Sequence, residues 1–147
     1  LVLSNRPVTA GEGRPWRCRR VARQPVCLVG PKLRARQRFR FPQDLREARL
    51  VLPGPTSDIR TQFDLLCEDL KLVPRVFAEV DDMAMLRLLA RDSGAVALLP
   101  AVVVQDELRA GSLQQYCTVP RVHENFYAIT TERRFQPELL RELLRAR

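Results

Sequence analysis

The sequence predicts an α/β protein with a parallel-rich sheet, and three observations lead to that prediction. Strand-like and helix-like segments alternate between residues 49 and 100, which is the order of a βαβαβ unit with right-handed crossovers. Residues 95–99 are apolar throughout, as in a strand that is covered on both faces. A chain of 147 residues with 46% apolar content can bury one core, or two small lobes that share one.

The first elements are expected to be strands separated by loops. Residues 1–3 predict a strand and residues 21–29 a second extended segment, with a loop rich in glycine, proline and arginine that ends at Pro15. Residues 50–52 predict a third strand, closed by residues 53–55. A helix should then begin at Thr56 or Ser57 as its N-cap, and it should stop before Pro74. Apolar residues of that helix recur at spacings of four, three and four, which is one helical face: Ile59, Phe63, Leu66 and Leu70.

The second half continues the alternation. Residues 75–80 predict a strand, Asp81 or Asp82 caps another helix, and Gly94 terminates it. The apolar residues of this helix should share one side: Met85, Leu86, Leu89 and Ala90. Beyond the strand at 95–99 we expect four more elements, a short helix at 102–108, strands at 113–118 and 125–130, and a last helix from Gln136.

Charge is concentrated in one segment. The net charge is +8, yet ten basic residues and no acidic ones lie between Arg14 and Arg40, which leaves fifteen basic against 17 acidic residues elsewhere. A uniformly basic nucleic-acid coat is therefore excluded, and we expect the segment to be mainly a solvated face, with non-specific phosphate binding as the alternative. The longest apolar stretch is ten residues, about half of the roughly 20 that span a bilayer, so no membrane partner is expected.

The ends and the cysteines predict a cytoplasmic fragment of a longer protein. Residues 1–4 contain no initiator methionine and no signal-peptide pattern. Four cysteines, at positions 18, 27, 67 and 117, match neither a metal-binding pair nor a dense disulfide framework. We expect them to be scattered small hydrophobic residues.

The inventory of reactive residues favours a binding protein over an enzyme, and no cofactor is expected. The one histidine, His123, is expected at a surface or hinge, and nucleophile, zinc and phosphate-loop motifs are absent. Polar residues instead follow two predicted parallel strands, Thr56 and Ser57 after the first, and Asp81 and Asp82 after the second. If these strands are neighbours, both groups meet at one edge of the sheet, where α/β proteins bind ligands. Simple helix capping is the competing interpretation for each group.

Four segments resemble the effector-binding domain of LysR-type transcriptional regulators: LVLS at 1–4, QPVCLVGP at 24–31, LVLPGPTS at 50–57 and SGAVALLP at 93–100. Two further segments, VFAEVDDMAML at 76–86 and ENFYAITTERR at 124–134, are similar to the NhaR-type subfamily of sodium/proton antiporter regulators. The resemblance implies a periplasmic-binding-protein-like fold of type II with a ligand cleft between two lobes. Lobe one would comprise residues 1–27 and 123–147, truncated at its N-terminus, and lobe two residues 29–119.

The resemblance further implies an effector-sensing and oligomerisation domain of a bacterial transcription activator that responds to sodium or pH. Expected partners are a second copy of the chain, a small effector or monovalent cation, and, in the full-length protein, RNA polymerase and DNA bound through a winged helix-turn-helix absent here. Across the cleft, Ser4, Asn5 and Arg6 would face Thr56, Ser57, Asp81 and Asp82, of which the two aspartates form a possible weak cation site. The alternatives are a solute-binding protein or enzyme of the same architecture, and a nucleic-acid-binding fragment that acts through the basic segment.

Overall fold

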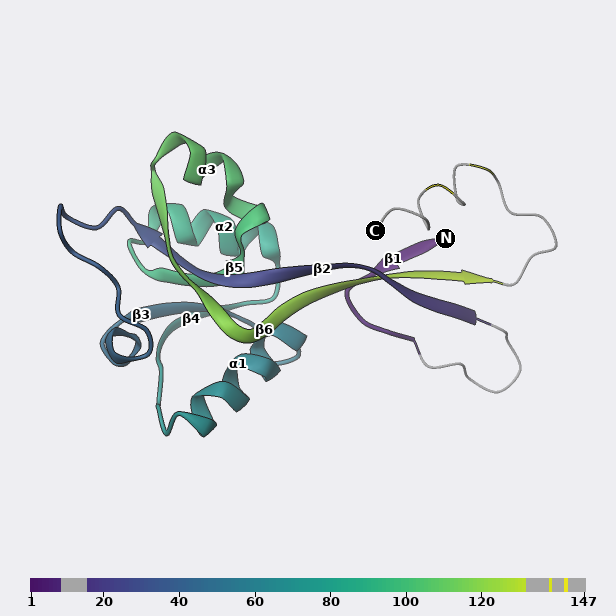
Figure 1. Ribbon diagram of the computed structural model, residues 1–147, viewed down its shortest axis with the longest axis horizontal. Coiled ribbons are helices and arrows are strands. Elements are labelled where there is room, and N and C mark those ends of the chain that lie inside the picture. The colour runs from purple at the N-terminus through teal and green to yellow at the C-terminus, as the bar shows by residue number, and fades with distance from the viewer. Residues whose placement is uncertain (9–15, 132–137, 139–141, 143–147) are drawn as a thin grey trace. The chain divides into compact units, whose positions relative to one another are not determined.

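The computed structural model describes residues 1–8, 16–131, 138 and 142. The protein is a mixed α/β protein with two compact units. Unit 1 comprises Leu1–Gln24 and Glu124–Arg147, and unit 2 comprises Pro25–His123. Two long strands, β2 (Trp16–Pro31) and β6 (Leu113–Thr131), each contribute residues to both units (Figure 1). All strands belong to one six-stranded sheet with the order β1-β6-β2-β5-β3-β4.

The predicted βαβαβ unit is confirmed and forms the body of unit 2. Its strands are β3 (Arg49–Pro53), β4 (Arg75–Val80) and β5 (Val96–Pro100), and its helices are α1 (Asp58–Asp69) and α2 (Met83–Asp92). Strand β3 lies between β4 and β5 and is parallel to both, whereas β5 pairs antiparallel with β2. Helix α1 covers one face of this sheet and α2 the other (Figure 1).

Alternation along the three central strands divides the core of unit 2 into two layers. On β3, Leu50 and Leu52 pack in the layer of α1, whereas Val51 packs in the layer of α2. The same alternation holds on β2 and β5, because successive side chains of a strand point to opposite faces. Every residue of β5 is buried, as the uniformly apolar stretch predicted.

The edge strand β4 is less regular. Its pairing with β3 shifts between Leu50 and Val51, so that Phe77 is the extra residue of a β-bulge. Phe77 is 47% exposed, and the Arg49 guanidinium lies 4.0 Å from the centroid of its ring, in cation–π geometry. A charged side chain therefore partly shields the apolar edge.

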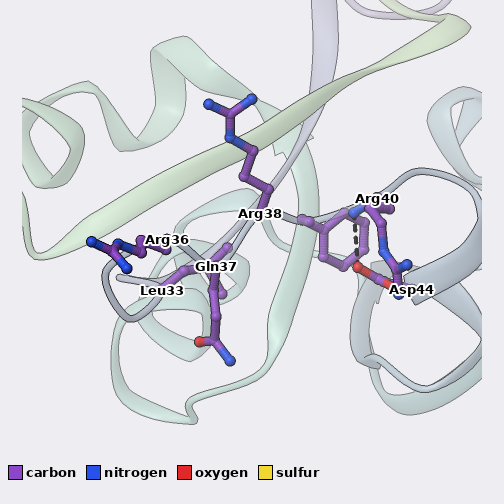
Figure 2. A pocket seen from close by; sticks show the side chains of 7 residues that line it. Leu33, Arg36, Gln37, Arg38, Arg40 and Asp44 are labelled. Carbon is purple, nitrogen blue, oxygen red and sulfur yellow. Dashed lines mark hydrogen bonds and ion pairs between the residues drawn. The ribbon is translucent and has the colours of Figure 1, made fainter.

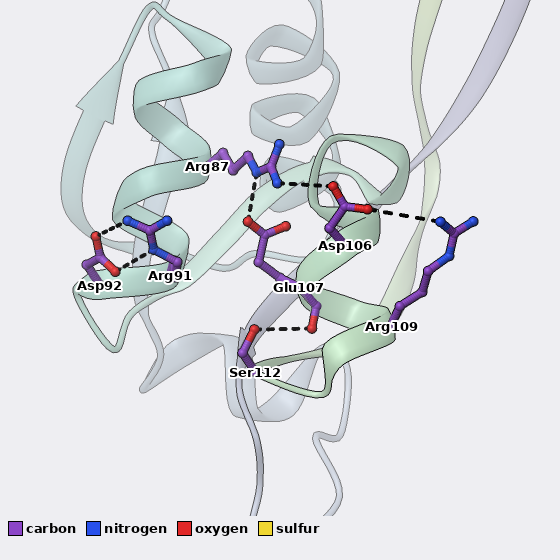
Figure 3. A network of polar contacts seen from close by, with 7 residues as sticks. All are labelled: Arg87, Arg91, Asp92, Asp106, Glu107, Arg109 and Ser112. Carbon is purple, nitrogen blue, oxygen red and sulfur yellow. Dashed lines mark hydrogen bonds and ion pairs between the residues drawn. The ribbon is translucent and has the colours of Figure 1, made fainter.

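A short helical segment follows β5 and forms ion pairs with α2. It consists of a 3₁₀ turn at Ala101–Val104 and helix α3 (Gln105–Ala110), close to the predicted helix at 102–108. Figure 3 shows Arg87 of α2 reaching both acids of α3, with its Nε 2.8 Å from Oε1 of Glu107 and its Nη2 3.6 Å from Oδ2 of Asp106. The hydrogen bond from Arg87 lowers the pKa of Glu107 below its usual value despite burial of that carboxyl.

Three local predictions need correction. The strands expected at 113–118 and 125–130 are one strand, β6, which continues past Pro120 with Arg121 at a φ of 65° and Val122 fully buried. Met85 does not share the buried side of α2, because Leu86 and Ala90 set the face that packs on the sheet and Met85 is 50% exposed. The second extended segment, β2, is also longer than residues 21–29.

In unit 1, strand β1 (Val2–Ser4) pairs antiparallel with β6, which confirms the strand predicted at residues 1–3. Ala128 and Ile129 of β6 are buried, whereas Val2 and Leu3 of β1 are 56% and 59% exposed. The loop predicted before Pro15 falls mostly outside the described residues. So does the helix predicted from Gln136, although residues 138 and 142 are helical.

In the described part of the chain, no helix has the length and apolar character that crossing a membrane requires. All four cysteines are free thiols, and two of them, Cys27 and Cys67, are buried. Burial raises the pKa of both Cys67 and Cys117 to about 11. A raised thiol pKa favours the neutral, unreactive form.

We predict that Cys67 and Cys117 resist alkylation in the folded chain. At pH 8, a thiol with a pKa of 11 is ionised in only about one molecule in a thousand, and the thiolate is the species that reacts with iodoacetamide. Peptide mass spectrometry should therefore find Cys18, which is half-buried in β2, labelled well before either of them. Labelling of all three at one rate in the folded chain would contradict this, whereas equal rates are expected in guanidinium.

Candidate functional site

The two βα junctions of unit 2 meet at one edge of the sheet. Strands β3 and β4 are neighbours in parallel register, with Pro53 opposite Val80 at their carboxyl ends. The Gly54 N–H extends this pairing by donating a hydrogen bond of 3.0 Å to the Val80 carbonyl. The segments that lead into α1 and α2 therefore leave the sheet side by side, as the geometric prediction required.

At the first junction, Ser57 is the N-cap of α1, but its side chain caps no amide of that helix. The Ser57 N–H donates to the Gly54 carbonyl at 3.0 Å, and the Ser57 carbonyl accepts from the N–H and hydroxyl of Thr61. Thr56 is exposed and Ser57 half-buried. The backbone thus fixes the turn and leaves the Ser57 hydroxyl for another partner at the positive end of the helix dipole.

At the second junction the two aspartates have different roles. Asp82 caps α2, because its Oδ1 accepts a hydrogen bond of 2.8 Å from the Met85 N–H. The Asp81 side chain lies over Gly54 instead, so closely that a β-carbon at position 54 would be 1.7 Å from its Oδ1. Asp81 is exposed, and among the described residues its carboxylate forms no hydrogen bond or ion pair. Capping thus accounts for Asp82 but not for Asp81.

Arg60 of α1, which the sequence analysis did not single out, connects α1 to both strands at the same edge. The Arg60 side chain is only 13% exposed, and its Nη1 lies 2.6 Å from Oε1 of Glu79 near the end of β4. It also donates to both carboxylate oxygens of Asp64 at 2.9 Å and to the Pro53 carbonyl at 3.3 Å. Burial lowers the Arg60 pKa, but the hydrogen bonds to Glu79 and Asp64 outweigh it and raise the pKa overall, so the cation is stable.

Glu79, a third acidic residue near the end of β4, is paired with Arg60 through its Oε1. The i,i+4 spacing of Arg60 and Asp64 on one helix was a visible signal of an ion pair. The pairing with Glu79 bridges two elements and needs the tertiary structure. Among the described residues, no group of three or more histidine, cysteine or acidic side chains could hold a metal ion.

The remaining candidate residues lie in unit 1. Ser4 ends β1 opposite Tyr127, and its hydroxyl accepts a hydrogen bond of 3.0 Å from the Arg6 N–H. Asn5 and Arg6 are exposed in the turn that follows. That these three face the junctions of unit 2 across a cleft stays a prediction.

His123 has a structural use in unit 2. It is half-buried in β6, and its backbone N–H donates to Oε1 of Gln62 at 3.0 Å. In return, Nε2 of Gln62 donates to the His123 carbonyl at 2.9 Å. This pair of hydrogen bonds fastens α1 to β6.

Comparison with solved structures shows the fold. The chain is similar to Vibrio fischeri DarR, a LysR-type regulator in complex with DNA, with a TM-score of 0.71 and 18% identity over 90% of this chain and 46% of that one. For CbnR, a LysR family transcriptional regulator, the TM-score is 0.69 and the identity 20%, over 92% of this chain and 48% of that one. For the Synechocystis CcmR regulatory domain, in complex with 2-PG, the TM-score is 0.68 and the identity 11%, over 97% of this chain and 70% of that one.

The chain thus spans about half the length of the first two regulators. No curated protein sequence matches it. The family model described as the LysR substrate binding domain, however, matches residues 2–146, which is nearly the whole chain. The fold, the parallel strand edge and this match agree, and the chain belongs to the LysR substrate-binding-domain family.

Proposed function

We propose that this chain is the effector-sensing domain of a LysR-type transcriptional regulator and that it binds a small polar effector without transforming it. The effector would occupy the edge where β3 and β4 end, contacting Thr56, Ser57 and Asp81 from unit 2 and Ser4, Asn5 and Arg6 from unit 1. Asp82 would hold the helix that carries this edge. The regulatory domain of CcmR, which shares the fold, is in complex with the small molecule 2-PG, and this supports an effector of similar size.

The observation that carries the proposal is the unused Ser57 hydroxyl at the start of a 12-residue helix. N-cap serines ordinarily accept a hydrogen bond from their own helix, which stabilises the helix by about 1 kcal/mol. At Ser57 that bond is not made, so the group can act on a ligand at little cost to the fold. The helix N-terminus favours an anionic or hydrogen-bond-accepting group there.

The whole protein would couple this site to DNA. We propose that a winged helix-turn-helix outside this chain binds the operator, that RNA polymerase is contacted in the assembled complex, and that effector binding shifts the equilibrium between oligomer geometries. Units 1 and 2 would be the two lobes. DarR, a LysR-type regulator of the same fold, is in complex with DNA, which supports the DNA-bound role.

We also propose self-association. Strand β1 lies at one end of the sheet order, and its Val2 and Leu3 side chains are more than half exposed. Unpaired strand edges with exposed apolar side chains are favourable surfaces for pairing with another chain. A second copy would cover them by strand addition or segment exchange.

A sodium- or pH-responsive activator of a sodium/proton antiporter gene is a second candidate, favoured by one observation. The Asp81 carboxylate is exposed and makes no hydrogen bond or ion pair with the described residues, so it can offer hard oxygen ligands to a cation. One carboxylate supplies too few ligands for a strong site. A sodium site here would need carbonyl or hydroxyl oxygens from the first junction as well.

A ligand screen tests the effector site. We expect some members of a panel of small carboxylates to raise the thermal midpoint of the chain, because a ligand that binds only the folded state stabilises it. Ser57→Ala should lower the affinity for a carboxylate that binds by roughly three- to tenfold, which is the contribution of one hydrogen bond. The thermal midpoint of this variant without ligand should be unchanged. Ser112→Ala is the matched control, since it removes a hydroxyl that donates to the Glu107 carbonyl in another part of unit 2. Equal affinity in the two variants would count against the site.

The two aspartates can be separated by a sodium titration. Asp82→Ala should lower the free energy of unfolding by about 0.5–2 kcal/mol through loss of the helix cap. Asp81→Asn should leave stability nearly unchanged and abolish any stabilisation by sodium chloride over choline chloride at one ionic strength. If Asp81→Asn keeps the full sodium effect, or if the unaltered chain has none, the cation-responsive candidate is wrong and the polar-effector proposal is unaffected.

A further inference from the structure

A loop of unit 2 carries a dense positive charge that the effector site does not use. This segment, residues 32–40, is here called the basic loop. It contains five cations and no carboxylate in nine residues, and all five are exposed: Lys32, Arg34, Arg36, Arg38 and Arg40. Such a concentration of like charge is destabilising unless a partner or solvent neutralises it.

The basic loop is anchored by β6 rather than loosely attached. The Tyr116 hydroxyl donates a hydrogen bond of 2.7 Å to the Pro31 carbonyl at the start of the loop. The Tyr116 ring stacks on Phe39 near the end of the loop, with centroids 5.1 Å apart and planes inclined by 19°. Between them, the Leu33 N–H donates to Oε1 of Gln114 at 3.0 Å. Both ends of the loop are therefore held against one strand.

A turn inside the loop points its guanidinium groups outward. The Gln37 N–H donates to the Arg34 carbonyl at 2.9 Å, and Oε1 of Gln37 accepts from the Arg34 N–H at 3.2 Å. Arg36, at the tip, has a φ of 71°. In Figure 2, the Arg36 and Arg38 side chains extend away from each other, whereas Arg40 turns towards Asp44, with its Nη2 3.1 Å from Oδ1.

Four of the five cations lack an acidic partner in the described structure. Asp44 neutralises Arg40, and the backbone N–H and guanidinium of Arg40 lower the Asp44 pKa. No carboxylate among the described residues pairs with the other four. The loop borders an open hollow of about 580 Å³, which is lined by Leu33, Arg36, Gln37, Arg38, Phe39, Arg40 and Asp44.

We propose that the basic loop binds the phosphate backbone of double-stranded DNA without reading its sequence. Guanidinium groups pair with phosphate through two parallel hydrogen bonds, and release of the DNA counterions drives such contacts. The choice of DNA rests on the proposed function, in which the domain is tethered to a DNA-bound protein. A weak contact then gains from a high effective concentration. An acidic protein surface is the competing occupant.

The test compares binding of a fluorescent random-sequence DNA duplex with the 147-residue chain and a loop variant over a series of salt concentrations. The loop variant replaces Arg34, Arg36 and Arg38 by glutamine, which leaves Phe39, Tyr116 and the other anchors in place. If each arginine contacts one phosphate, the slope of log affinity against log salt concentration should fall by about 2.7, since each phosphate contact contributes about 0.9.

A matched control removes the same charge elsewhere in unit 2. Lys71, Arg75 and Arg109 are exposed cations outside the loop, and replacing all three by glutamine lowers the net charge by the same amount. This control should change the slope by much less than the loop variant. Exchanging the three loop arginines for lysine should preserve most of the slope, because the charges remain. Circular dichroism verifies that each variant folds.

The proposal is overturned if the unaltered chain does not bind the duplex. It is also overturned if the slope of log affinity against log salt concentration falls by the same amount in the loop variant and in the control variant. It is also overturned if the loop binds polyglutamate more tightly than DNA at equal charge, which would identify an acidic protein as the partner. No effector is present in these titrations, so none of these results bears on the effector site.

Discussion

The structure of unit 2 depends on the burial of two adjacent strands, β3 and β5. All residues of β5, and Leu50, Val51 and Leu52 of β3, are inaccessible or nearly so. Strands that are apolar on both faces require a helix on each face, and here α1 and α2 provide it. Because the crossovers return each strand parallel to β3, the carboxyl ends of β3 and β4 meet at one edge. The candidate effector site is a consequence of this burial.

Much of this arrangement could be predicted from local sequence. The uniformly apolar residues 95–99 and the helical spacing from Ile59 to Leu70 determine which elements form and which faces they bury. The helix N-caps were expected at Thr56 or Ser57 and at Asp81 or Asp82, because short polar side chains favour that position, and the structure has them at Ser57 and Asp82. The family resemblance extended these local predictions to the whole fold, and the family match over residues 2–146 confirmed it.

What could not be predicted depends on contacts between residues distant in sequence. Nothing near Arg60 indicates that it bridges to Glu79, and nothing near Phe39 indicates that Tyr116, seventy-seven positions later, holds it. The position of the Asp81 carboxylate over Gly54 of the preceding βα junction also depends on a contact between segments distant in sequence. The two strands expected at 113–118 and 125–130 are one strand, β6, in which Val122 is buried in the core of unit 2. Tertiary packing decided each case.

Hydrogen exchange of backbone amides tests most directly whether the buried strands support the rest of the unit. If β3 and β5 are the common constraint, amides of their buried residues, such as those of Val51 and Ala97, should exchange only through global unfolding. Amides beside the bulge at Phe77 should exchange through smaller local openings, since β4 lies at the end of the sheet. Exchange of Val51 and Ala97 as fast as that of Phe77, at a free energy well below that of global unfolding, would contradict this account.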